Sequence, residues 1–128
     1  MYNSLDLFQT AAAMARHAGS RQAVVARNIA HADTPGYAAQ HIPAFQDVYK
    51  DGEPNQMRAT RAGHVRGGAQ AATGAVLTTT NSEASPNGNT VSLEEELLNS
   101  VAVSREHNRA LAIYKHGMTI LRNSLGRS

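Results

Sequence analysis

Apolar and small residues recur at alternating steps of three and four near the start of the chain. From about residue 3 to residue 32, this spacing is typical of a long helix that packs one face against another helix. The positions that share this face are Phe8, Ala11, Ala15, Ala18, Gln22, Val25, Ile29 and Ala32. Because its first half is mostly alanine, the pattern predicts a close helix contact with little hydrophobic free energy at each position.

A second helix is predicted from Ser92 to about Leu125. Ser92 and Glu95 have the spacing of a capping box, and Glu94–Glu96 suit the positive first turn of a helix. We call its apolar face the C-terminal stripe, which comprises Leu97, Val101, Ser104, Asn108, Leu111, Tyr114, Met118, Leu121 and Leu125. Its polar members, Ser104 and Asn108, indicate either a layer of hydrogen bonds between helices or a stretch of wetted surface.

The two helices are each expected to be roughly 45 Å long, well above the usual length in a globular domain. The pattern therefore predicts a mainly α fold in which the terminal helices pair as an antiparallel coiled-coil hairpin. We expect one domain with three parts, an N-terminal helix and turn (1–37), a flexible middle region (38–89) and a C-terminal helix (90–128).

The first helix is expected to end in a sharp turn. Thr34-Pro35-Gly36-Tyr37 places proline and glycine at the two central positions of a type II turn, and Pro35 moves Thr34 out of the α region. In the middle region, Phe45, Val48 and Tyr49 indicate one helical turn and residues 76–80 a short strand. Frequent glycines interrupt every other pattern there, which favours a loop that is flexible or ordered by a partner.

The composition offers little material for a core. Leu, Ile, Val and Phe total 23 residues against 22 alanines, and 17 of the 23 lie in residues 1–37 and 90–128. A small domain of this kind needs extra stabilisation from disulfides, a metal or association. The chain has no cysteine, and no two of its six histidines have metal-pair spacing. We therefore expect association with other subunits and no metal or other cofactor.

Other functional classes have weaker support. No nucleophile, base and orienting group can be nominated, and consecutive carboxylates at Glu94–Glu96 point in different directions around a helix, so we expect no enzyme. Ten arginines and a sequence pI near 9.3 leave a small basic helical nucleic-acid-binding protein as the alternative. Two observations oppose this alternative. The basic residues of the middle region are sparse, namely Arg58, Arg61 and Arg66, and the few aromatic residues offer bases little to stack on. The chain start lacks a basic n-region and no segment is apolar enough for a membrane span, so we expect neither a cleaved signal peptide nor a direct span.

Two segments carry a resemblance to a known family. Residues 26–37, ARNIAHADTPGY, resemble the N-terminal signature of the flagellar rod and hook proteins, whose usual form is close to ANNIANADTPGY. Residues 87–97, NGNTVSLEEEL, resemble the DGNTVDLEEEM segment that opens the C-terminal helix in the proximal-rod branch of this family. Arg27 and His31 stand where the family usually has asparagine, and Ser92 where it has aspartate.

The resemblance implies a structural subunit of the bacterial flagellar basal body, not an enzyme. Such a protein is exported by the type III apparatus without a cleaved signal peptide and assembles into the rod in the periplasmic space, which transmits torque and encloses the export channel. Its implied partners are further copies of itself, the rod proteins FlgC and FlgF, the adaptor FliE, the membrane-supramembrane ring and the export apparatus.

Pattern and resemblance together nominate a set of assembly residues. They are Phe8, Val25, Asn28, Ile29, Asp33, Pro35, Gly36, Tyr37, Leu97, Val101, Asn108, Leu111, Met118 and Leu121. Asn28 is a polar residue among apolar ones, and it either sets the register between subunits or is an exposed or capping residue near the helix end.

Overall fold

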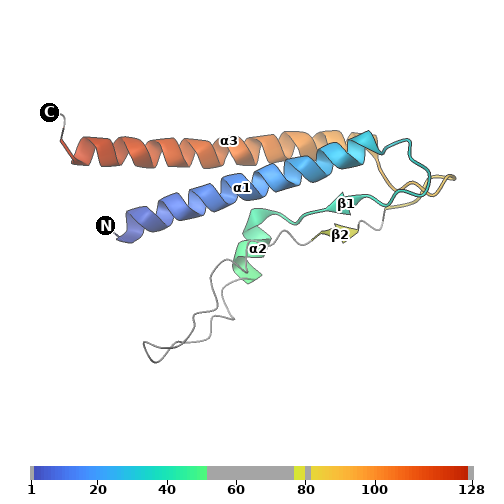
Figure 1. The fold of residues 1–128 in the computed structure, drawn as a ribbon, viewed down its shortest axis with the longest axis horizontal. Helices are drawn as coiled ribbons and strands as arrows, with labels where there is room; N and C mark the ends of the chain where they lie inside the picture. Colours follow the sequence, from blue (N-terminus) through green and yellow to red (C-terminus); the bar gives the residue numbers. More distant parts are fainter. Residues whose placement is uncertain (1, 52–76, 80–81, 127–128) are drawn as a thin grey trace, which may run out of the picture.

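The computed structural model describes residues 2–51, 77–79 and 82–126 and is built on two long helices. Helix α1 (Tyr2–Ala30) and helix α3 (Leu93–Ser124) pack against each other along their length. They run in opposite directions, so that the start of α1 and the end of α3 lie at the same end of the molecule (Figure 1). The prediction of a mainly α fold with two paired terminal helices is confirmed.

A short segment between the helices folds back along α1. It contains strand β1 (Gln40–His41) and helix α2 (Phe45–Asp51), and we call residues 37–51 the arm. Strand β1 pairs antiparallel with β2 (Thr78–Thr79). Both β1 and α2 contact α1, so that α1 lies between α3 and the arm (Figure 1).

The structure bears on the middle region only in part. The helical turn expected near Phe45 is confirmed as α2, and the short strand expected in residues 76–80 is confirmed as β2. The predicted flexible region is residues 38–89, of which residues 52–76 and 80–81 lie outside the described residues.

Small side chains line the contact between α1 and α3. Those that α1 buries include Ala11, Ala18 and Val25, and those of α3 include Val103 and Ala110. Such residues let two helices approach closely but remove little apolar surface from water at each position. The predicted face of α1 is therefore confirmed at these three α1 positions, whereas Gln22 is exposed.

Helix α3 turns a different face toward α1 from the one predicted. Its buried residues recur every seven positions and are Glu96, Val103, Ala110 and Gly117. Four members of the C-terminal stripe, Leu97, Ser104, Leu111 and Met118, lie one residue further along, which is about 100° around a helix. Leu97, Val101, Leu111 and Met118 accordingly remain 54%, 51%, 49% and 40% exposed. These four residues therefore do not make the contact with α1, because the alanine-rich face of α1 packs against the small side chains instead. Their role in assembly stays a prediction.

An aromatic contact joins the two helices toward the end where α1 begins and α3 finishes. The rings of Phe8 and Tyr114 meet edge to face with their centroids 5.1 Å apart. Phe8 also covers Gly117, where an added Cβ would lie 3.0 Å from the Cε1 atom of Phe8. A glycine at this position lets α3 pass directly over the phenylalanine ring.

Candidate functional site

The two segments that resemble the flagellar family meet at the end of the helix pair where α1 finishes and α3 begins. The backbone N–H of Gly36 donates to the Asn87 carbonyl over 3.0 Å, and the N–H of Thr90 donates to the Tyr37 carbonyl over 3.0 Å. We call this site the junction, made of Asn28, residues 31–40, residues 85–92 and Glu96. The segments recognised separately in the sequence thus form one site.

Asn28 is the centre of the junction. Its side chain is completely buried, and its amide Nδ2 donates to the Gln40 carbonyl over 2.7 Å and to Glu96 Oε1 over 3.0 Å. Its Oδ1 accepts from the Gln40 N–H over 3.1 Å and from the Tyr37 hydroxyl over 3.2 Å. An asparagine amide offers two donors and two acceptor sites, so all of its capacity is used.

These bonds set the relative positions of α1, the arm and α3 within one chain. The alternative of an exposed Asn28 is wrong. A role in setting the register between subunits stays a prediction.

Glu96 is the partner of Asn28 on α3. Glu94 and Glu95 are exposed, whereas Glu96 is buried against α1, as expected for consecutive residues on a helix. Its burial raises the pKa of the carboxyl group, and the hydrogen bond from Asn28 opposes this effect. Within the described part of the chain, Oε2 of Glu96 has no hydrogen-bond partner. One turn earlier, Ser92 caps the helix by accepting from the Glu95 N–H, as predicted.

Asn89, which lies in the second of the two recognised segments, holds the backbone just after the end of α1. Its side chain is buried, and Nδ2 lies 2.9, 2.8 and 2.8 Å from the carbonyl oxygens of His31, Ala32 and Thr34. These three carbonyls belong to the turn just after α1, and a buried amide is well suited to supply donors to backbone oxygens shielded from water. Its Oδ1 accepts from the Val91 N–H over 2.8 Å. The start of α3 and the end of α1 are thereby joined by one side chain.

The turn after α1 has the geometry expected from its sequence. Gly36 has a φ of 71°, and the Tyr37 N–H donates to the Thr34 carbonyl over 3.3 Å. A positive φ at the third residue is the mark of a type II turn, which is confirmed here. A Cβ at Gly88 would lie 3.4 Å from the Gly36 Cα, so glycine also lets the two turns approach closely. His31 stacks on Tyr37 with ring centroids 4.6 Å apart.

Gly36→Val is expected to destabilise the junction by about 1–3 kcal/mol, because a β-branched residue is strained at positive φ. Urea unfolding followed by circular dichroism measures this loss. Gly36→Asn is the matched control, since asparagine adopts positive φ more readily and should lose less. Equal stability of the valine variant and the unaltered chain would contradict the prediction.

The structure distributes the predicted assembly residues over three environments. Asn28, Gly36 and Tyr37 take part in the junction, beside Asp33 and Pro35, whose side chains are exposed. Phe8, Val25 and Ile29 on α1 and Leu121 on α3 are buried or half-buried. Exposed on α3 are Leu97, Val101, Asn108, Leu111 and Met118.

Gln40, Asn89 and Glu96 are junction residues that sequence reasoning did not nominate. Asn89 and Glu96 lie inside the recognised segment, whose resemblance was the one available signal for them. Gln40 uses its backbone N–H and carbonyl, so its side-chain type carries no signal at all.

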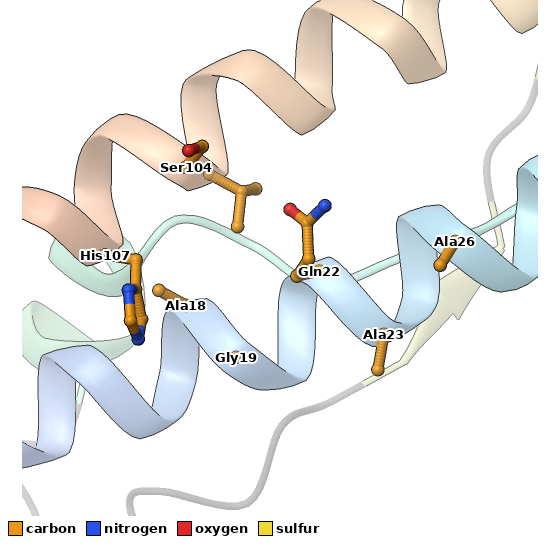
Figure 2. Close-up of a pocket in the computed structure, with 8 residues that line it drawn as sticks. Ala18, Gly19, Gln22, Ala23, Ala26, Ser104 and His107 are labelled. Atoms are coloured by element: carbon orange, nitrogen blue, oxygen red, sulfur yellow. The ribbon is translucent and has the colours of Figure 1, made fainter.

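A shallow groove of about 510 Å³ runs beside the contact between α1 and α3. Figure 2 shows the lining residues of α1, most of them small, with Gln22 directed toward α3, which contributes Ser104 and His107. It is lined by Ala18, Gly19, Gln22, Ala23, Ala26, Val103, Ser104 and His107. Ser104 belongs to the C-terminal stripe, so the groove and the exposed apolar face of α3 adjoin each other.

No protein-family model matches the chain, and no curated protein matches it significantly in sequence. The described residues contain no helix long and apolar enough to cross a membrane, and no cluster of three or more side chains suited to a metal ion.

Proposed function

We propose that the chain is a structural subunit of the bacterial flagellar rod, similar to the proximal rod protein FlgB. In this proposal the two terminal helices form an antiparallel coiled-coil hairpin, and neighbouring hairpins pack into a tube that transmits torque and encloses the export channel. The observation that carries the proposal is the exposed apolar face of α3.

This face extends along much of the helix, with the exposed polar residues Ser104 and Asn108 between its apolar ones. Leu97, Val101, Leu111 and Met118 are each at least 40% exposed and extend over roughly 30 Å of α3. Apolar patches of this kind on a protein surface mark interaction sites, because covering them removes apolar area from water. The adjoining groove has small side chains on its α1 wall, which would let a neighbouring helix approach closely. Helix packing between subunits uses both features.

The junction supports the proposal in a second way. The positions that match the family signature include Asn28, Gly36 and Tyr37, and each has a definite structural task at the closed end of the hairpin. In this proposal the signature residues that perform these tasks hold the two helices in one relative register. A rigid hairpin is the form in which a subunit can present the same helix face to every neighbour.

The resemblance supplies the proposed partners and location. They are other copies of the chain, the rod proteins FlgC and FlgF, the adaptor FliE, the membrane-supramembrane ring and the export apparatus. The proposed location is the rod within the periplasmic space, reached by type III export without a cleaved signal peptide.

Val101→Gln combined with Leu111→Gln is expected to abolish swimming and to remove the chain from purified basal bodies. Both residues are exposed, so the hairpin should fold while its contact with neighbours is lost. The test complements a deletion strain of the source bacterium with each variant. The matched control, Leu98→Gln with Ala112→Gln, changes two exposed α3 residues off the C-terminal stripe and should leave assembly intact.

Two results would refute the proposal. One is normal assembly of the Val101 and Leu111 variant, and the other is absence of the unaltered chain from basal bodies. A salt-dependent shift of labelled DNA by the purified chain, together with that absence, would favour the nucleic-acid-binding alternative.

A further inference from the structure

His17 is a buried titratable side chain that takes no part in the junction. It lies on α1, where only 6% of its surface is exposed, and neither ring nitrogen has a hydrogen-bond partner among the described residues. Its ring meets that of Phe45, the first residue of α2, at 65° with centroids 5.6 Å apart. A neutral imidazole fits such a contact, whereas an imidazolium ion has two N–H donors that need acceptors or water.

The charged groups around His17 do not provide for a positive charge. Arg21 lies one turn further along α1, and its guanidinium Nη1 is 2.7 Å from Oε2 of Glu106 on α3. Glu106, whose negative charge acts on His17, is thus already paired with Arg21. On the arm, α2 offers the exposed Asp47 and β1 the exposed His41. Burial of the ring lowers the pKa of His17, Arg21 lowers it further, and Glu106 opposes the change.

We propose that His17 is a pH-sensitive latch, which holds α2 against α1 while the imidazole is neutral and releases it when the imidazole is protonated. The contact that must open is small, because α2 rests on α1 through few residues and Phe45 covers the ring. Release lets water reach both ring nitrogens. The latch is independent of the proposed function, since it requires no neighbouring subunit.

The other end of the arm is expected to respond to acid in the opposite sense. A histidine whose pKa is lowered in the folded chain stabilises it fully above about pH 6.5, and this stability is lost as the pH falls through the folded pKa. A glutamate whose pKa is raised disfavours the folded chain at neutral pH, and this penalty disappears as the pH falls through the raised pKa toward about 4.5. Mild acid should therefore release α2 near His17 and leave β1 attached near Asn28 and Glu96.

Nuclear magnetic resonance on the full chain tests the latch directly, at a concentration where circular dichroism shows both long helices formed. A titration from about pH 7.5 to about pH 5 covers the range in which an imidazole becomes charged. We expect the proton contacts between His17 and Phe45 to disappear with the same midpoint as the His17 ring titration. Contacts between Tyr37 and Asn28 should persist. Persistence of the His17–Phe45 contacts after His17 has become charged would overturn the proposal.

Hydrogen exchange of the α2 amides in His17 variants tests the latch independently. The exchange rates are corrected for the intrinsic rate at each pH. Acid should reduce the protection of these amides in the unaltered chain, because protonation of His17 favours the released state. His17→Phe should keep its protection in acid, and His17→Arg should lack it already at neutral pH. His116→Gln, at an exposed histidine of α3, should respond like the unaltered chain. Equal acid sensitivity of His17→Phe and the unaltered chain would refute the latch.

Discussion

Asn28→Asp should destabilise the chain by about 3–5 kcal/mol near neutral pH, the range typical of a buried charge left without a partner. The substitution preserves the shape of the side chain but replaces the Nδ2 donor with an oxygen. That oxygen would face the Gln40 carbonyl and Glu96 Oε1, which now accept from Nδ2 over 2.7 and 3.0 Å. Two attractive contacts become repulsive in a site that is completely buried.

Urea unfolding of the full chain, followed by circular dichroism, measures this effect. Asn108→Asp is the matched control, because it makes the same chemical change at an exposed position of α3 and should alter stability by less than about 0.5 kcal/mol. Glu96→Gln in the Asn28→Asp background should recover part of the loss, since a glutamine amide can donate to the new carboxylate. Equal stability of the Asn28 and Asn108 variants would contradict the central role of Asn28.

Gly117→Leu should destabilise the pairing of α1 and α3 by about 3 kcal/mol, at the upper end of the usual range for overpacking. A Cβ alone would lie 3.0 Å from the Phe8 Cε1 atom, and leucine adds three more carbons on the same side. Leucine favours a helix by about 1 kcal/mol more than glycine does, which offsets part of the loss. The expected result is therefore a net loss caused by contact with Phe8.

A second substitution isolates this cause. Phe8→Ala removes the ring that the leucine meets, so the variant with both changes should be more stable than Gly117→Leu alone. Ala112→Leu, at an exposed position of the same helix, should leave the unfolding midpoint nearly unchanged. The steric explanation fails if Phe8→Ala lowers the stability of Gly117→Leu further.

Local chemistry in the sequence was sufficient to predict the helices and the turn. Alternating steps of three and four predicted α1 and α3, Ser92 predicted the start of α3, and Pro35 with Gly36 predicted the turn. Each of these features depends on a few neighbouring residues, because capping, positive φ and helical periodicity all act over one or two turns of chain. The structure agrees with all three.

The two segments that resemble flagellar proteins both contribute to the junction, but the resemblance does not explain the hydrogen bonds made there. Asn28 was recognised as a polar residue among apolar ones, but its four hydrogen-bond partners come from α3, β1 and Tyr37. Partners this distant in the chain leave no local pattern. The same holds for His17, whose burial depends on Phe45 and on the approach of the arm.

The sequence by itself determined two long helices, their ends and the tight turn after α1, whereas only the tertiary structure decided which face of α3 meets α1. Hydrophobic periodicity favoured Leu97, Val101, Leu111 and Met118 for that contact, yet Val103, Ala110 and Gly117 occupy it. The two choices lie only one or two residues apart along the chain, and periodicity ranks faces by hydrophobicity alone. Close packing against alanines on α1, the ring of Phe8 over Gly117 and the buried bond between Asn28 and Glu96 all require the smaller face. These are contacts between distant residues, and they leave the larger apolar side chains exposed on the surface of α3.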